Sequence, residues 1–516
     1  MGQNIKIYII VAAITFVTIA LFKPALNPTL GDEEYKRWRS ILLFSPLPFL
    51  FIPNYWLAVL VLFALLTTIT PKEVGKRAVY FILALLCLPN LMKDIPGAAG
   101  INILFEMSSI RLVILAMLLP ALSAISSSSN RLRLFQHPID KYVVGYILLT
   151  LLLYMRNMES ITSFLREGWY SYLDHFLIYY VVSRAIQSKE DLRAAFYAFA
   201  VVGTIMAMIT LFEFVTNWLI FHDLHHFVGS DAPKFSAYAT VRAGVSRPVA
   251  AYFQPIELGL ILAVCIGCFT ALFYTQKFGK NKWIIIAILV GGLLGTLSKG
   301  PLLGAVAFAL VFVILGKSAI KSLVMLGIFV LVTLGTLSVV PHGDKVLSVL
   351  PIVGEPNSES FDYRSLLFQQ SMLVIKKNLL FGSTNFLETP EMQVLIQGQG
   401  IIDIVNTYIA VALTYGGVGL FFYVMILVSS ALCAYKNMRR CEGKDDELKV
   451  YGQALVALIV AFALTIATVS SIGRIWQVLL ILVALSTAYS VIVRNMLSAE
   501  QQSKQTITPP ARDRFK

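Results

Sequence analysis

The chain has 516 residues, of which 57% are hydrophobic and only 14% are charged, and its formal net charge is +13. A soluble globular protein of this length would not carry so much apolar surface, so that class is excluded. The apolar runs are continuous rather than alternating, which excludes a membrane β-barrel. The positive charge lies in short loops between these runs, a pattern that sets membrane orientation and does not indicate nucleic-acid binding.

The apolar runs predict an all-α polytopic membrane protein with about fourteen transmembrane helices in one domain over residues 1–493. The block at 40–70 contains three prolines and is either one kinked helix or a short hairpin. Residues 494–516 form a polar tail that we expect to be disordered and cytoplasmic. The expected spans are 5–22, 40–70, 77–92, 109–127, 141–155, 169–186, 192–216, 257–275, 283–297, 301–316, 322–340, 402–434, 451–470 and 475–493.

Two long segments, 217–256 and 341–401, fall on the face opposite the basic loops, which we expect to be periplasmic. The second is longer than an ordinary connection, so we expect it to be functional. Its stretch FDYRSLLFQQSMLVIKKNLLFG has apolar residues at helical spacing. This spacing predicts an amphipathic helix that lies on the membrane surface or on the helix bundle.

Four cations lie on this outer face, where positive charge is normally avoided. Arg242 and Arg247 precede the span that begins near residue 257, Lys299 lies in the break GTLSKGPLLG, and Arg364 lies in the second long segment. Guanidinium groups bind pyrophosphate oxygens in a bidentate manner, so a lipid-linked pyrophosphate is a natural ligand. The alternative is that each cation reaches separately to the lipid headgroups. The four together favour a binding site.

The order of four stretches resembles the O-antigen ligase and polymerase superfamily, over about residues 160–435. These stretches are RPVAAYFQPIELG, LLGTLSKGPLLG, YRSLLFQQSMLVIKKNLLFG and DIVNTYIAVALTYGGVGLFF. The resemblance implies a GT-C-like glycosyltransferase of the bacterial inner membrane. Such an enzyme moves a glycan from undecaprenyl pyrophosphate to an acceptor hydroxyl on the periplasmic face.

The chain departs from the ligase pattern in two places. The ligases usually carry Arg where this chain has Lys299, and His where it has Val405. The missing histidine favours the exopolysaccharide or O-antigen polymerases of the Wzy type. At the same place, Asp403 is a candidate proton acceptor, Asn406 a candidate for holding a sugar hydroxyl, and Tyr408 a candidate substrate contact. The alternative is that the D-x-x-N pattern is only a helix N-cap.

Two glutamates complete the candidate site. Glu213 lies about one turn from the periplasmic end of its span, and a charged group at membrane depth faces a partner or a wet cavity, so Glu213 is a second candidate base. Glu257 lies at the mouth of the next span. It either provides a favourable charge at the N-terminus of that helix or orients Arg247.

Other polar groups have simpler explanations. Asp174 and His175 are adjacent and point in different directions, so we interpret Asp174 as the structural partner of another span rather than as half of a dyad. The stretch HDLHH at 222–226 has no third ligand at a fixed spacing, and surface histidines are the better interpretation. No metal or other cofactor is therefore expected.

The residues and the resemblance together predict an inverting polymerase that joins undecaprenyl-pyrophosphate-linked oligosaccharides into a surface polysaccharide. A chain-length regulator is a candidate partner protein. One alternative is a ligase that transfers glycan to lipid A core or to a protein. An alternative of another class is a transporter of lipid-linked sugars, but a transporter should show internal repeats, and the sequence has no convincing repeat.

Overall fold

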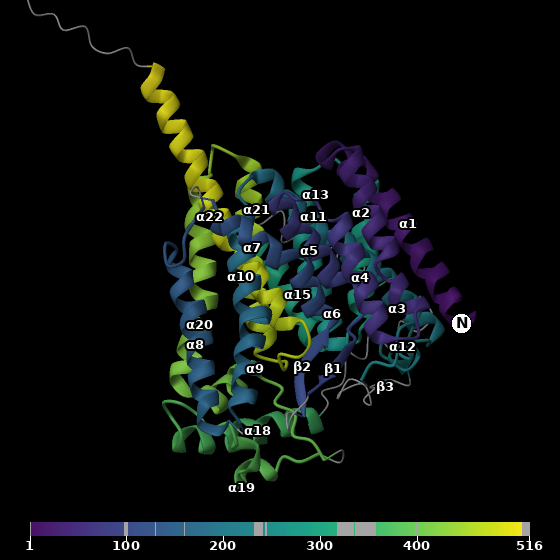
Figure 1. The fold of residues 1–516 in the computed structure, drawn as a ribbon. Coiled ribbons are helices and arrows are strands. Elements are labelled where there is room, and N and C mark those ends of the chain that lie inside the picture. The colour runs from purple at the N-terminus through teal and green to yellow at the C-terminus, as the bar shows by residue number, and fades with distance from the viewer. Residues whose placement is uncertain are drawn as a thin grey trace, which may run out of the picture.

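The structure is a computed structural model, and it describes residues 2–97, 102–128, 131–158, 160–231, 241–242, 245–316, 335, 358–397 and 400–507. These residues are mostly helical, and seven of their helices are long and apolar enough to cross a membrane (Figure 1). The all-α polytopic character is therefore confirmed, whereas the count of fourteen spans stays a prediction. The seven are Gly2–Leu30, Ser109–Ser126, Lys189–Thr216, Pro255–Thr275, Thr407–Arg440, Asp446–Ile466 and Ile475–Gln502.

The first half of the described chain contains most of the short elements. Its α-helices are α1 (Gly2–Leu30), α2 (Asp32–Phe44), α3 (Leu47–Phe51), α4 (Tyr55–Ile69), α5 (Val74–Cys87), α6 (Ser109–Val113), α7 (Leu119–Ser126), α8 (Pro138–Tyr154), α9 (Ile161–Ser171), α10 (Ile178–Ala185), α11 (Lys189–Thr216) and α12 (Leu224–Val228). The π-helical turns η1 (Ile114–Leu118) and η3 (Tyr172–Leu177) continue α6 and α9, and η2 (Met155–Asn157) is a 3-10 turn.

The helical elements of the second half are α13 (Pro255–Thr275), α14 (Asn281–Gly295), α15 (Lys299–Ile314), α18 (Ser358–Lys377), η4 (Phe386–Glu388), α19 (Pro390–Gln393), α20 (Thr407–Arg440), α21 (Asp446–Ile466) and α22 (Ile475–Ile507). Two antiparallel hairpins join β1 (Met92–Pro96) to β2 (Ile103–Ser108) and β3 (Val241–Arg242) to β4 (Val245–Ser246).

The block at 40–70 is broken rather than continuous. Helix α3 ends at Phe51, and α4 begins at Tyr55 after the extended residues around Pro53. Asn54 caps α4, because its side chain accepts a hydrogen bond from the backbone N–H of Leu57. Proline cannot donate the backbone hydrogen bond that a continuous helix would need, and it restricts the residue before it to extended conformations.

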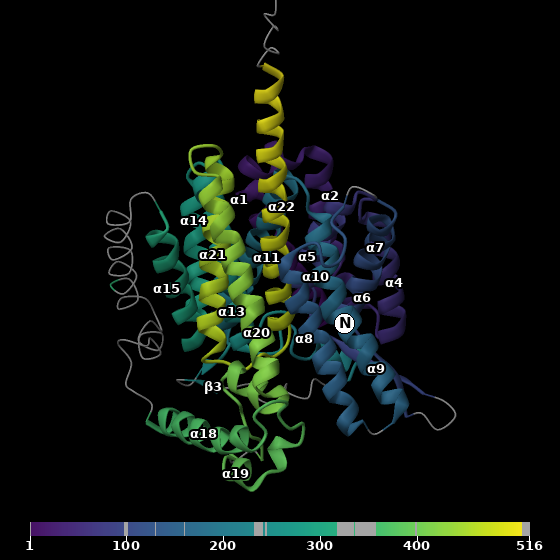
Figure 2. The ribbon, with the colours of Figure 1, turned by 90° about the vertical axis from the view of Figure 1, so that its left-hand side faces the viewer.

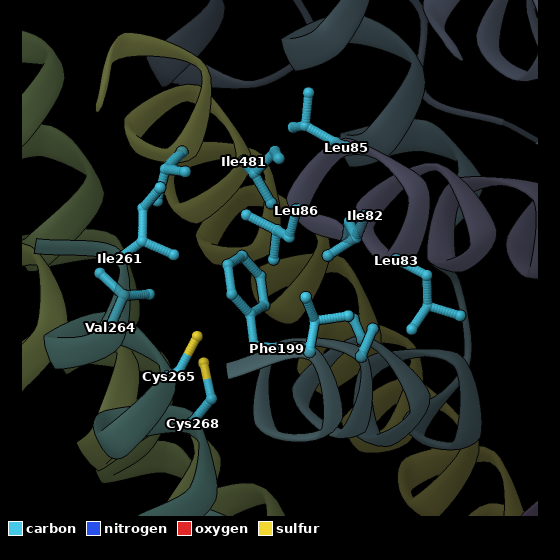
Figure 3. Close-up of a cluster of buried hydrophobic side chains, with 14 of the residues drawn as sticks. Ile82, Leu83, Leu85, Leu86, Phe199, Ile261, Val264, Cys265, Cys268 and Ile481 are labelled. Carbon is cyan, nitrogen blue, oxygen red and sulfur yellow. The ribbon is translucent and has the colours of Figure 1, made fainter. Parts of the chain in front are cut away.

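The core lies where α5, α11, α13 and α22 pack together (Figure 3). Cys265 and Cys268 point into this apolar cluster beside Phe199, and both are buried free thiols. A Cβ atom added to Gly203 would lie 2.3 Å from the Cβ of Cys265, so the glycine lets α11 and α13 approach closely. The CxxC pair therefore serves packing, as its apolar setting predicts.

One end of the helix bundle carries the elements that lie outside it. Helices α18 and α19 and the β1–β2 hairpin lie at this end, and the C-terminal part of α22 projects from the opposite end (Figures 1 and 2). The amphipathic helix predicted in the second long segment is confirmed as α18. Its residues Leu367 and Val374 are buried in a small core with Leu413 of α20.

Helix α20 does not cross the bundle as the single span predicted at 402–434. Gly416 has φ +67° and ψ −166°, values outside the helical region. The rings of Tyr408 and Tyr423 lie 6.0 Å apart. In a straight helix their Cα atoms would be about 22 Å apart, so the chain turns back at Gly416. Residues 407–415 therefore form a short re-entrant arm, and 417–440 form the long arm.

Two further predictions concern the chain's later segments. Helix α22 extends to Ile507, so residues 494–507 are helical in contrast to the predicted disordered tail. These polar residues extend the apolar helix that begins at Ile475, because extending an existing helix costs far less free energy than nucleating a new one. The predicted span at 322–340 lies outside the described residues except for residue 335.

Candidate functional site

The turn between α14 and α15 positions the first predicted cations. Arg247 is only 8% exposed, and its guanidinium donates to the carbonyl oxygen of Thr296 at 3.2 Å and to Oγ of Ser298 at 2.5 Å. Leu297 between them has φ +51°, a left-handed conformation that makes the turn tight. Lys299 follows as the first residue of α15. Arg247 and Lys299 therefore meet at one turn, although they lie in different segments of the sequence.

The loop at 467–474, between α21 and α22, contacts this turn and accepts a hydrogen bond from a third cation. A Cβ atom on Gly300 would lie 2.9 Å from Oγ1 of Thr468, so the two segments touch. Arg364 of α18 donates to the carbonyl oxygen of Thr468 at 3.4 Å. The guanidinium of this exposed residue of α18 thus reaches the 467–474 loop, which touches the turn that holds Arg247 and Lys299.

The 467–474 loop also holds Asp403. Ser470 Oγ donates to Oδ1 of Asp403 at 3.0 Å and lies 2.9 Å from the carbonyl oxygen of Ile404. From the other side, the Tyr363 hydroxyl accepts from the backbone N–H of Asp403 at 3.1 Å and donates to its carbonyl oxygen at 2.9 Å. Burial raises the pKa of Tyr363, so this phenol stays protonated. Asp403 is therefore fixed between the 467–474 loop and α18.

Asn406 and Tyr408 make structural contacts at the start of α20. The side-chain oxygen of Asn406 accepts from the backbone N–H groups of Tyr408 at 2.9 Å and Ile409 at 3.2 Å, so Asn406 is the N-cap. The Tyr408 hydroxyl donates to the carbonyl oxygen of Ala463 on α21 at 2.9 Å. Both residues fix the re-entrant arm, and a direct substrate contact by either stays a prediction.

Glu213 organises the segment that carries Arg247. Its carboxylate is fully buried and accepts from the backbone N–H groups of Ile220 at 2.9 Å, Val249 at 3.0 Å and Ala250 at 2.9 Å. These bonds tie both ends of the first outer segment to α11. Three backbone N–H groups that donate to one carboxylate stabilise the fold of this segment. The role of Glu213 as a base stays a prediction.

Glu257 contacts the 467–474 loop and reveals a cation that the sequence reasoning missed. Its buried carboxylate accepts from the backbone N–H of Arg474 at 2.7 Å and of Phe253 at 3.1 Å. The Arg474 side chain is fully buried, donates to the carbonyl oxygen of Leu88 at 2.6 Å and lies over the ring of Tyr252. Its sequence signal is a single arginine in the short loop SSIGRIW between two spans.

The remaining predicted residues lie away from these two turns or make other contacts. Arg242 lies in strand β3, and its backbone pairs with that of Val245. The HDLHH stretch forms α12 and its N-terminal side, with the rings of His225 and His226 3.9 Å apart. Over the residues that the structure describes, no group of three or more His, Cys, Asp or Glu side chains could hold a metal ion.

Asp174 has the structural partner that the sequence predicts. Arg111 of α6 donates to its carboxylate at 2.8 Å and 3.0 Å, and the same guanidinium contacts Glu106 at 2.9 Å. The Arg111 guanidinium also lies 3.6 Å from the ring centre of Tyr170. The contacts of Arg111 join the β1–β2 hairpin to α9 and η3. His175 takes no part in these contacts.

Residues 284–424 match the family model described as O-antigen ligase. The match includes the α14–α15 turn, α18 and the re-entrant arm, and it confirms the resemblance to the O-antigen ligase and polymerase superfamily. No curated protein matches the chain. The match supports a function of the ligase or polymerase type, that is, glycosyl transfer from lipid-linked oligosaccharides by a membrane enzyme.

Proposed function

We propose that the protein is an inverting, GT-C-like polymerase of undecaprenyl-pyrophosphate-linked repeat units that makes an exopolysaccharide or O-antigen. One observation carries the proposal. Arg247 and Lys299 lie at the α14–α15 turn, and this turn touches the 467–474 loop, whose residues bond Arg364 and Asp403. Three cations beside a carboxylate suit a reaction that releases a pyrophosphate and a proton.

We infer the membrane orientation from the end of the bundle at which the basic loops lie. At the end opposite the site, Lys189 and Arg193 begin α11 and form ion pairs with Asp445 at 2.8 Å and Glu447 at 2.6 Å. The basic loops lie at that end, which we assign to the cytoplasm. The site and α18 then face the periplasm of the bacterial inner membrane, where the pyrophosphate of a lipid-linked glycan would leave the bilayer.

The chemical step needs no redox change. The hydroxyl oxygen of the acceptor attacks C1 of the donor sugar, and the bond from C1 to the pyrophosphate oxygen breaks with inversion at C1. The electron pair leaves with the pyrophosphate, where Arg247, Lys299 and Arg364 stabilise the added charge, and the same role for Arg242 stays a prediction. Asp403 takes the proton of the hydroxyl. These cations supply the positive charge that a metal ion provides in other transferases, so we propose a reaction that needs no metal.

A ligase is the second candidate, because the matching family model is described as O-antigen ligase. In that case the acceptor is lipid A core or a protein instead of a second lipid-linked glycan. The residue before Asn406 is Val405, where the ligases usually have histidine, and this difference favours the polymerase.

The polysaccharide of cells that carry Arg247→Ala tests both candidates. A polymerase predicts that single lipid-linked repeats accumulate and long polymer is lost. A ligase predicts polymer of normal length that is not attached to its final acceptor. Arg439→Ala, which changes an exposed arginine at the far end of α20, is the matched control. Normal, attached polymer from the Arg247 variant at normal expression would exclude the proposed site.

A further inference from the structure

Two polar side chains near the re-entrant arm have no polar partner. Glu167 of α9 and His175 of η3 are each half-buried. Among the described residues, neither side chain makes a hydrogen bond or an ion pair, whereas Asp174 between them is fully engaged by Arg111. Neither side chain has a buried polar atom without a partner, so both polar ends reach solvent and are available to a ligand. The π-helical turn that contains His175 is a feature frequent at functional sites.

Aromatic rings from three other helices lie near these groups. The ring of His175 lies 5.8 Å from that of Trp476 on α22, and Trp476 lies 5.5 Å from Tyr146 on α8. Tyr146 in turn lies 5.9 Å from Tyr415, the last residue before the reversal of α20, and Tyr415 interacts electrostatically with Glu167. Trp476 and Tyr415 are half-buried, so part of each ring is open to solvent.

The aromatic cluster is continuous with the candidate site. Tyr423 stacks on Trp476 at 5.4 Å and contacts Tyr408 at 6.0 Å, and Tyr408 begins the arm that follows Asp403. Trp476 lies at the start of α22, directly after the 467–474 loop that holds Asp403. A sugar bound against Trp476 would therefore lie close to the loop that holds Asp403.

We propose that Glu167, His175, Tyr415 and Trp476 form the binding subsite for the acceptor saccharide. The proposal rests on the proposed glycosyl transfer and names where its second substrate binds. Saccharides present apolar C–H faces and rows of hydroxyl groups, and such ligands suit aromatic rings with a few convergent polar groups. The carboxylate of Glu167 accepts from sugar hydroxyls, and a ring nitrogen of His175 makes one further hydrogen bond. The cations at the α14–α15 turn and on α18 are proposed to bind the donor pyrophosphate.

The test titrates the purified full-length protein with the free oligosaccharide repeat, released by mild acid from the lipid-linked pool of the same cells. Binding is followed by saturation-transfer-difference NMR. We expect Glu167→Gln and His175→Ala each to weaken binding about tenfold, because each removes one hydrogen bond from a partly buried ligand. Glu388→Gln and His226→Ala change exposed residues of the same types and should not alter binding.

The pH dependence gives a second readout that a structural role of Glu167 would not produce. Burial raises the pKa of Glu167, against the opposing effects of Arg111 and Arg166 and with the added effect of Asp174. Binding by the wild type should therefore weaken at a higher pH than an ordinary glutamate would require, as the carboxylate gains its proton. The Glu167→Gln variant should lack this step. Wild-type affinity and pH profile in both variants would overturn the proposal, as would no binding by the wild type.

The arginine variant separates this inference from the proposed function. The free oligosaccharide carries no pyrophosphate, so Arg247→Ala should bind it like the wild type while failing to make polymer. If Arg247→Ala makes normal polymer, the proposed function fails. The titration with the Glu167 and His175 variants still decides whether this surface binds a saccharide.

Discussion

Replacing Gly416 with alanine should abolish polymer formation, because the reversal of α20 depends on this glycine. Its φ of +67° and ψ of −166° belong to a region that is almost restricted to glycine, and alanine there costs about 1–3 kcal/mol. A Cβ atom would also lie 2.4 Å from the carbonyl oxygen of Leu380 and from the backbone nitrogen of Phe381. Backbone atoms cannot move aside as flexible side chains do, so overpacking adds about 1–3 kcal/mol.

The total of about 2–6 kcal/mol corresponds to at least a roughly thirtyfold loss of the correctly folded arm. The assay compares the fraction of protein that elutes as a monodisperse peak in detergent with the polymer made in cells. Gly443→Ala is the matched control, because Gly443 has φ +74° and no atom within 4 Å of an added Cβ. It should cost only about 1–2 kcal/mol. Wild-type elution and polymer from the Gly416 variant would refute the reversal of α20.

Two further predictions distinguish a residue that positions a reacting group from a residue that stabilises the fold. Ser470→Ala removes the hydrogen bond to Asp403, so we expect about a tenfold loss of polymerisation rate in membranes. The free energy of unfolding should change by only about 1 kcal/mol. An unchanged rate would exclude Asp403 from the reaction. Glu213→Gln replaces one of two acceptor oxygens with a donor facing backbone N–H groups, and we expect it to cost about 1–3 kcal/mol and to lower the midpoint of thermal unfolding. Complete loss of activity with an unchanged midpoint would instead identify Glu213 as the base.

The sequence alone predicts the class of the protein, which the structure confirms, and it proposes most residues of the candidate site. Continuous apolar runs have one stable outcome in lipid, because every backbone polar group must find its partner within a helix. The cations on the outer face were visible as departures from the charge pattern of the loops. The helix at α18 followed from its periodic apolar residues, and the N-cap at Asn406 was one of the two interpretations that the D-x-x-N pattern allowed.

The tertiary structure shows which of these residues lie close together and where the chain reverses its direction. Hydropathy measures how apolar a segment is, so 402–434 looks like one span. The backbone of Gly416 and the contact between Tyr408 and Tyr423 show that the chain turns back. Arg474 was overlooked because a lone arginine in a loop is ordinary until Glu257, far away in the sequence, is found against its backbone. The lack of partners at Glu167 and His175 is likewise a property of three-dimensional neighbours, which no local pattern records.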